Sequence, residues 1–208
     1  MQNAPSARTI RVLGLDPAAA GPTGYGIVEA EGRKCRALHF GALKVGEKRK
    51  ESVGAALEAV HTLICDLIQE FSPQAVAVES IFSALNVKTA LRLAEVRGVV
   101  LLAASQHQVE VFSYAPREIK ASIAGYGNAD KRQMQLMVRA LLAMTEVPEP
   151  ADAADALAVA MCHVQVDALR TRFGTSVVPL SGKPTSRSAI ARAAATTQVT
   201  FPRISSQR

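Results

Sequence analysis

The chain has 208 residues, 49% of them apolar, which is enough to bury one full core but not two. Six of the 24 basic residues and none of the 18 acidic residues lie after residue 170, so the net charge of +6 belongs to the tail. The absence of an 18-residue apolar run and of a hydrophobic N-terminal segment argues against a membrane or secreted protein and favours a cytoplasmic one. Three scattered cysteines argue against a zinc site or a disulfide framework and are expected to be buried thiols.

The first third of the body reads as three strands. "TIRVLGLD" (9–16) is a β-branched, apolar run that ends at Asp16, and "TGYGIVEAEG" and "KCRALHFGALKV" follow with a turn at Gly32. Short connections between consecutive strands predict an antiparallel start to the sheet.

Helices and strands then alternate. Apolar residues recur with a helical period over 50–71, where Ser-Pro ends the pattern. "QAVAVE" (74–79) is a strand suited to the middle of a sheet, and it ends at Glu79. A helix over 87–105 and a fifth strand over 108–114 complete this part.

The last part of the body is helical, with segments over 116–124, 130–143 and 151 to about 169. "GYGNAD" separates the first two of these helices, and Asn128 can cap the second. This order of elements predicts an α/β fold, in which a mixed five-stranded sheet is flanked by helices.

"PADAADALAVAM" (150–161) places two aspartates on an otherwise apolar helix. Asp152 and Asp155 are three residues apart, so they share one side of its first turns. The helix dipole gives one ordinary reason for acidic residues there. The other is that paired carboxylates need a cation between them, and a divalent metal ion is the usual occupant.

Asp16 and Glu79 supply the further carboxylates that a metal site requires. Both lie at carboxyl ends of apolar strands, where open α/β sheets bind ligands, and they converge if the first and fourth strands are neighbours. Four carboxylates can hold two Mg²⁺ ions, which suits in-line hydrolysis of a phosphodiester. His163 lies about 16 Å along the helix from Asp152 and is interpreted as structural.

Several segments together resemble a known family. "LGLDP", "TGYGIV", "AVESIF", "LRLAEVRGV", "YAPREIKASIAGYGNADKRQM" and "ADAADALAVA" are similar, in order and spacing over about 10–168, to the RuvC family of Holliday-junction resolvases. The resemblance implies a ribonuclease-H-like fold. It also implies that the family's catalytic, metal-binding carboxylates correspond to Asp16, Glu79, Asp152 and Asp155.

The resemblance assigns roles to three further residues. Phe82 matches an aromatic residue that stacks on unpaired bases, and Lys120 and Lys131 match basic residues that lie against the DNA backbone. Without the family, Phe82 would be read as a loop residue packed on the core. One departure is the stretch "DPAAAGPTGYG", which lacks the family's usual Gly-Ser-type pair after Asp-Pro and has one residue more.

We therefore expect a disordered N-terminal extension (1–8), a nuclease domain (9–169) and a basic, disordered tail (170–208) that contacts an anionic polymer or only aids solubility. The expected enzyme makes paired nicks in four-way DNA junctions with two Mg²⁺ per active site, and Mn²⁺ can substitute. Two symmetric nicks call for a homodimer, with the helix over 87–105 as its candidate surface. A branch-migration complex is a further possible partner. The alternatives are a nuclease for structured RNA and a non-catalytic junction-binding module.

Overall fold

The computed structural model describes residues 8–18, 21–32, 34–44, 52–80 and 86–173. The strands are β1 (Thr9–Asp16), β2 (Thr23–Glu31), β3 (Lys34–Leu43), β4 (Ala75–Glu79) and β5 (Glu110–Tyr114). The helices are α1 (Val53–Phe71), α2 (Val87–Gln106), α3 (Pro116–Ala124), α4 (Lys131–Leu141) and α5 (Ala151–Phe173). The five predicted strands and five predicted helices are confirmed, and boundaries differ by a few residues.

The strands form one mixed sheet in the order β3-β2-β1-β4-β5. β1 to β3 are antiparallel, whereas β4 pairs in parallel with both β1 and β5. The first and fourth strands are therefore neighbours, as the convergence of Asp16 and Glu79 requires. The predicted turn lies at Gly32, whose φ of 60° suits glycine.

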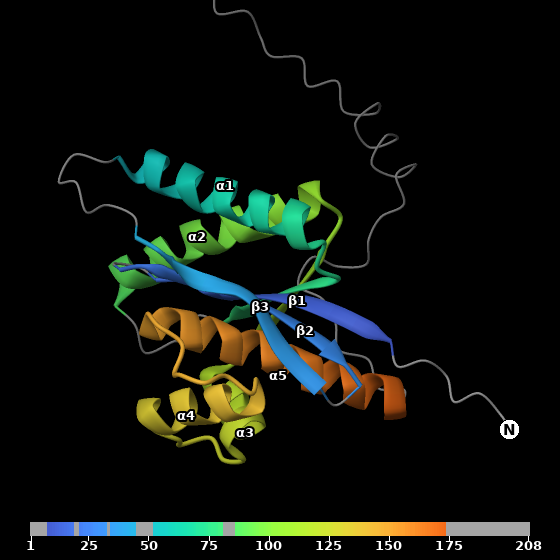
Figure 1. Cartoon of the computed structure of the whole chain (residues 1–208). Helices are drawn as coiled ribbons and strands as arrows, with labels where there is room; N and C mark the ends of the chain where they lie inside the picture. Colours follow the sequence, from blue (N-terminus) through green and yellow to red (C-terminus); the bar gives the residue numbers. More distant parts are fainter. Residues whose placement is uncertain (1–7, 19–20, 33, 45–51, 81–85, 174–208) are drawn as a thin grey trace, which may run out of the picture.

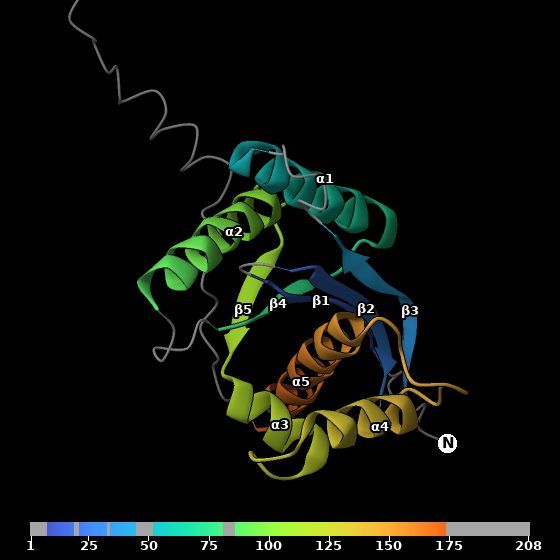
Figure 2. The same ribbon diagram turned by 90° about the vertical axis from the view of Figure 1, so that its left-hand side faces the viewer.

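Helices cover both faces of the sheet (Figure 1). α1 and α2 pack on one face around a core that includes Leu13, Leu15 and Val76. α5 packs on the other face, and α3 and α4 lie outside it (Figure 2). Within the described residues, no helix combines the length and apolar character needed to cross a bilayer.

Glycines in the strands let α5 lie directly on the sheet. A Cβ at Gly14 would come within 2.1 Å of the Ala156 carbonyl oxygen, and one at Gly26 within 2.7 Å of a Leu157 methyl carbon. Gly14 and Gly26 face each other across β1 and β2. The alanine-rich sequence of α5 completes this close packing, which buries Ala153, Ala156 and Ala160.

Three local predictions need correction. The N-cap of α4 is Asp130 rather than Asn128: its side chain accepts a hydrogen bond from the Gln133 amide while the Gln133 side chain accepts one from the Asp130 amide. α5 continues to Phe173 rather than ending near 169. Of the three thiols, only Cys162 is buried, and the other two are partly exposed.

Candidate active site

Strand alternation places Asp16 and Glu79 side by side. Leu15 pairs with Val78 in the parallel β1–β4 ladder, and each carboxylate is the next residue along its strand. Ala77 belongs to the core on the α5 face of the sheet, and because side chains alternate, Glu79 lies on that face too. Gly14 also faces α5, so Asp16 follows on the same face.

A third glycine brings the start of α5 to this edge. Gly24 pairs with Asp16, and a Cβ at Gly24 would lie 2.0 Å from the Asp152 carbonyl oxygen. Any larger residue at position 24 would push the first turn of α5 away from the sheet. This contact explains why a glycine stands next to the carboxylates, a role that was not predicted from the sequence.

The electrostatics of the carboxylates show that they lie close together. Burial, together with the negative charges of Glu79, Asp155 and Asp152 and a hydrogen bond with Glu79, raises the pKa of Asp16 to about 8. Burial also raises the pKa of Glu79; the Asp155 charge adds to this, whereas the hydrogen bond with Asp16 and the Lys120 ammonium oppose it. Without a metal ion, a pKa of about 8 lets Asp16 keep its proton at neutral pH and share it with Glu79 in that hydrogen bond.

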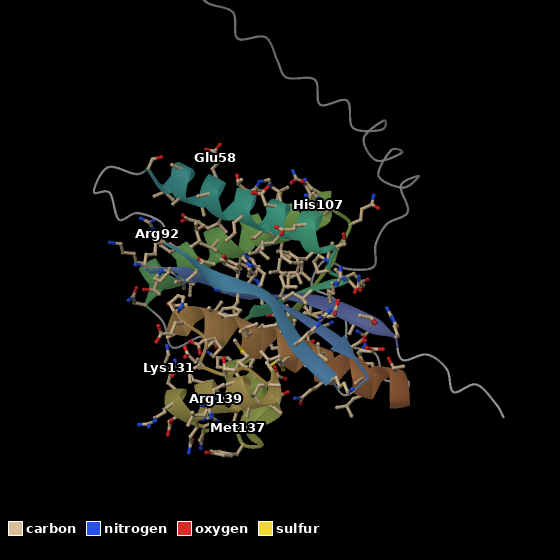
Figure 3. The ribbon with its side chains drawn as sticks, viewed as in Figure 1. Glu58, Arg92, His107, Lys131, Met137 and Arg139 are labelled. Atoms are coloured by element: carbon tan, nitrogen blue, oxygen red, sulfur yellow. The ribbon has the colours of Figure 1, made fainter. Side chains whose placement is uncertain are left out.

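A cleft beside these carboxylates contains both predicted lysines. Glu79, Asp155, Lys120 and Lys131 line it, together with side chains of α3, α4 and α5 that include Pro116 and Met134. Lys131 Nζ lies 3.1 Å from Asp155 Oδ2, and this ion pair raises the pKa of Lys131. Figure 3 shows Lys131 at the start of α4, on the side of the molecule where α5 begins.

The carboxylate donors have the chemistry that a hard divalent cation prefers, although the side chains are not closed around one. In the described part of the chain, no three Asp, Glu, His or Cys side chains are arranged closely enough to hold an ion. Without a cation, carboxylates repel, and here a shared proton and the Lys131 ammonium offset part of their charge.

The structure therefore brings together six of the seven predicted site residues. Phe82 lies outside the described residues. His163 is buried and lies away from this cleft, in agreement with the prediction that it is structural.

The comparisons with known proteins agree with this arrangement. The family model described as "Crossover junction endodeoxyribonuclease RuvC" matches residues 12–163. The crossover junction endodeoxyribonuclease RuvC of Natranaerobius thermophilus is 45% identical over 162 residues, which cover 78% of this chain and 99% of that protein.

Solved structures give the same result. Thermus thermophilus RuvC in complex with a Holliday junction substrate is 34% identical with a TM-score of 0.73, covering 78% of this chain and 97% of that one. The yeast mitochondrial Holliday junction resolvase Ydc2 shares the fold, with 15% identity, a TM-score of 0.59, and coverage of 82% of this chain and 84% of its own. The expected ribonuclease-H-like nuclease fold is confirmed, and the chain belongs to the crossover junction endodeoxyribonuclease RuvC family.

Proposed function

We propose that this protein is a metal-dependent endonuclease that resolves four-way DNA junctions by hydrolysing phosphodiester bonds. One observation supports this most directly. Asp16, Glu79 and Asp155 come from three elements to one edge of the sheet, and burial and mutual repulsion raise the pKa values of Asp16 and Glu79. A cluster of this kind is costly unless a cation completes it.

We assign the metal ligands to Asp16, Glu79, Asp152 and Asp155, and we expect two Mg²⁺ ions, which Mn²⁺ can replace. Bound divalent ions would activate a water molecule and stabilise the leaving oxygen of the scissile phosphate. The chain's own contribution is the placement of its charges. The close contact with Gly24 positions Asp152, and the pairing of β1 with β4 places Asp16 and Glu79 side by side.

Lys120 and Lys131 are proposed to hold the DNA backbone at the cleft. Both line it beside Glu79 and Asp155, which places positive charge where a phosphate must approach a negative cluster. Lys131 is the first residue of α4, so phosphate oxygens near it also meet free helix amides. Phe82 remains a prediction for stacking on unpaired bases.

We further propose that the enzyme is a homodimer that pairs through α2. Val87 and Leu91 are 75% and 61% exposed, and Leu102 continues the same stripe along the helix. Gly98 lies in this stripe, and a Cβ at position 98 would meet no atom within 4 Å. Packing within one chain therefore does not require a glycine at this position. A second helix crossing at Gly98 would cover the stripe.

The dimer surface can be tested with one apolar substitution and a matched control. Leu91→Glu should shift the protein to a monomer in sedimentation velocity, because it places a charge in the proposed interface. Leu141→Glu alters a leucine on α4 that is 41% exposed and should leave the dimer intact. Equal behaviour of both variants would contradict the assignment to α2.

The function is tested by incubating the protein with synthetic four-way junctions, linear duplexes and RNA hairpins of matched length, with Mg²⁺ and with EDTA. We expect paired nicks in the DNA junction only, and only with Mg²⁺. Preferred cleavage of the RNA hairpin would instead identify a nuclease for structured RNA. Binding of the junction without cleavage would identify a non-catalytic module.

A further inference from the structure

His163 and Tyr114 form a buried polar pair that the proposed chemistry does not use. His163 lies on α5 and is 2% exposed, and its Nδ1 lies 2.7 Å from the Tyr114 hydroxyl oxygen. Burial lowers the pKa of His163 to about 4, so the imidazole is neutral at physiological pH. Tyr114 keeps its proton, because burial raises its pKa, so the hydroxyl can donate to Nδ1 in the tautomer of neutral His163 that carries its proton on Nε2.

The tyrosine lies beside a site carboxylate. Tyr114 is the last residue of β5, and it pairs with Glu79 across the parallel β4–β5 ladder. The Tyr114 carbonyl also accepts a hydrogen bond of 2.9 Å from the Ser80 amide, which fixes the end of β4 immediately after Glu79. Any shift of Tyr114 would therefore change the position of Glu79.

The same tyrosine immediately precedes the N-cap residue of α3, Ala115. Pro116, the first residue of α3, follows Tyr114 by two positions, and Lys120 lies one turn further on. Ser122, near the end of α3, donates a hydrogen bond of 2.8 Å to Gln165 of α5, so α3 is attached to α5 at that end. The Tyr114–His163 bond supplies the attachment at the other end.

His163 lies on the helix that carries Asp155, eight residues and about 12 Å along the axis from it. One hydrogen bond thus joins the helix of Asp155 to the strand beside Glu79 and to the start of the helix of Lys120. We propose that Tyr114 and His163 are positioning residues that set the spacing between Glu79, Lys120 and Asp155. This inference rests on the proposed function, because it concerns the same site.

Packing alone does not explain the pair. The ring centroids of His163 and Phe112 are 4.5 Å apart, and the Arg170 guanidinium carbon lies over the Phe112 ring, 5.5 Å from its centroid. An apolar side chain at position 163 could keep such contacts. The hydrogen bond, in contrast, has a direction and a length, and its loss would leave a buried hydroxyl or ring nitrogen without a partner.

The test uses Tyr114→Phe, His163→Leu, the double variant and His163→Gln, whose amide oxygen can still accept from Tyr114. Two quantities are measured in the full chain: the Mn²⁺ concentration that gives half of the maximal thermal stabilisation without DNA, and the junction cleavage rate at saturating metal. Ile64→Val is the control, because Ile64 of α1 is fully buried in the core on the opposite face of the sheet from Tyr114 and His163.

We expect Tyr114→Phe and His163→Leu each to raise the half-saturating Mn²⁺ concentration about five- to tenfold and to slow cleavage. The double variant should be no worse than either single variant, and His163→Gln should recover most of the metal affinity. Ile64→Val should lower Tm without changing the metal dependence.

Unchanged metal dependence in Tyr114→Phe and His163→Leu, or additive losses in the double variant, would overturn the positioning role. If the wild-type protein cleaves junctions and is stabilised by Mn²⁺, that result leaves the proposed function intact. A wild-type protein that shows neither property would overturn the proposed function and this inference with it.

Discussion

A single glutamate and a cluster of carboxylates lie at opposite ends of β1 and β2 and differ in how their charge is balanced. At one end, Glu29 lies between Arg11 and Arg36 of the neighbouring strands, with N···O distances of 2.7 Å to Arg11 Nε and 2.8 Å to Arg36 Nε. At the other end, Asp16 faces Glu79 and the aspartates of α5. The same pair of strands therefore carries one carboxylate with its cations and one without.

The pKa values record this difference. Hydrogen bonds from Arg11 and Arg36 lower the pKa of Glu29, although its side chain is only 10% exposed. Burial and neighbouring negative charge raise the pKa of Asp16 to about 8. Glu29, whose counter-ions are arginines of the same chain, stabilises the fold. Asp16 lacks such counter-ions, and its cluster is arranged for a cation from solution.

The strongest way to break this comparison is to remove charge from the cluster. Asp16→Asn, Glu79→Gln, Asp152→Asn or Asp155→Asn should each slow junction cleavage a thousandfold or more, because several kcal/mol of transition-state stabilisation are lost. Junction binding, measured by fluorescence anisotropy, should persist. A variant that cleaves at nearly the wild-type rate would remove that residue from the metal site.

Gly24→Ala tests whether the close approach of α5 places the cluster. The added methyl group would meet the Asp152 backbone at 2.0 Å, so α5 must move, at a cost of about 1–3 kcal/mol, and cleavage should fall. Gly54→Ala is the control, since its nearest contact is 3.8 Å away, at the exposed start of α1. Equal stability and activity of both variants would show that Gly24 does not position Asp152.

Glu29→Gln should have the opposite profile to the cluster variants. It should destabilise the fold by about 1–3 kcal/mol in urea unfolding, while the folded protein cleaves at the wild-type rate. Because the folded-state pKa of Glu29 is lowered, its contribution is present above its ordinary value of 4.5 and is lost as the pH falls below it. Loss of cleavage with unchanged stability would contradict a structural role.

The smallest effect concerns residues 174–208 of the basic tail, which lie outside the described residues. Deletion of 174–208 removes five basic residues. Each phosphate contact contributes about 0.9 to the log–log salt slope of DNA binding. If about half of these charges contact phosphates at once, the slope should fall by about two or three. Identical slopes for the full and truncated chains would assign the tail to solubility or to a protein partner.

The sequence predicts the elements well because their signals are local. The apolar strands that end at Asp16 and Glu79 and the alanine-rich helix of Asp152 each carry their own pattern, and the β1–β4 pairing then follows from one topological assumption. The N-cap residue of α4 is harder to predict from the sequence, because Asn128 and Asp130 are both good N-cap residues. Only the capping box that Asp130 forms with Gln133 identifies Asp130 as the N-cap.

Contacts between distant residues could not be predicted in the same way. Nothing local marks Gly24 as the residue beneath Asp152, since a glycine in a strand is equally consistent with a bulge or a turn. The partner of His163 lies 49 residues away and becomes evident only when β5 and α5 are packed together. The ion pairs of Glu29 similarly depend on strand register.

The central claim is that the carboxylate cluster at Asp16 lacks a cation that a divalent metal supplies. It is tested by urea unfolding of the wild-type protein and Asp16→Asn at pH 5 and pH 8 with EDTA, and at pH 8 with Mg²⁺. Native Asp16 keeps its proton to about pH 8, whereas the unfolded chain loses it near its ordinary pKa of 3.8. Without metal, wild-type stability should therefore fall as the pH rises through this window, by up to about 1.4 kcal/mol per pH unit for one proton.

Mg²⁺ should restore the wild-type stability at pH 8. Asp16→Asn should show a shallower fall with pH and gain little from Mg²⁺, because it has neither the proton to lose nor the charge that binds the metal. Equal stabilisation of both proteins by Mg²⁺, or of neither, would contradict the claim.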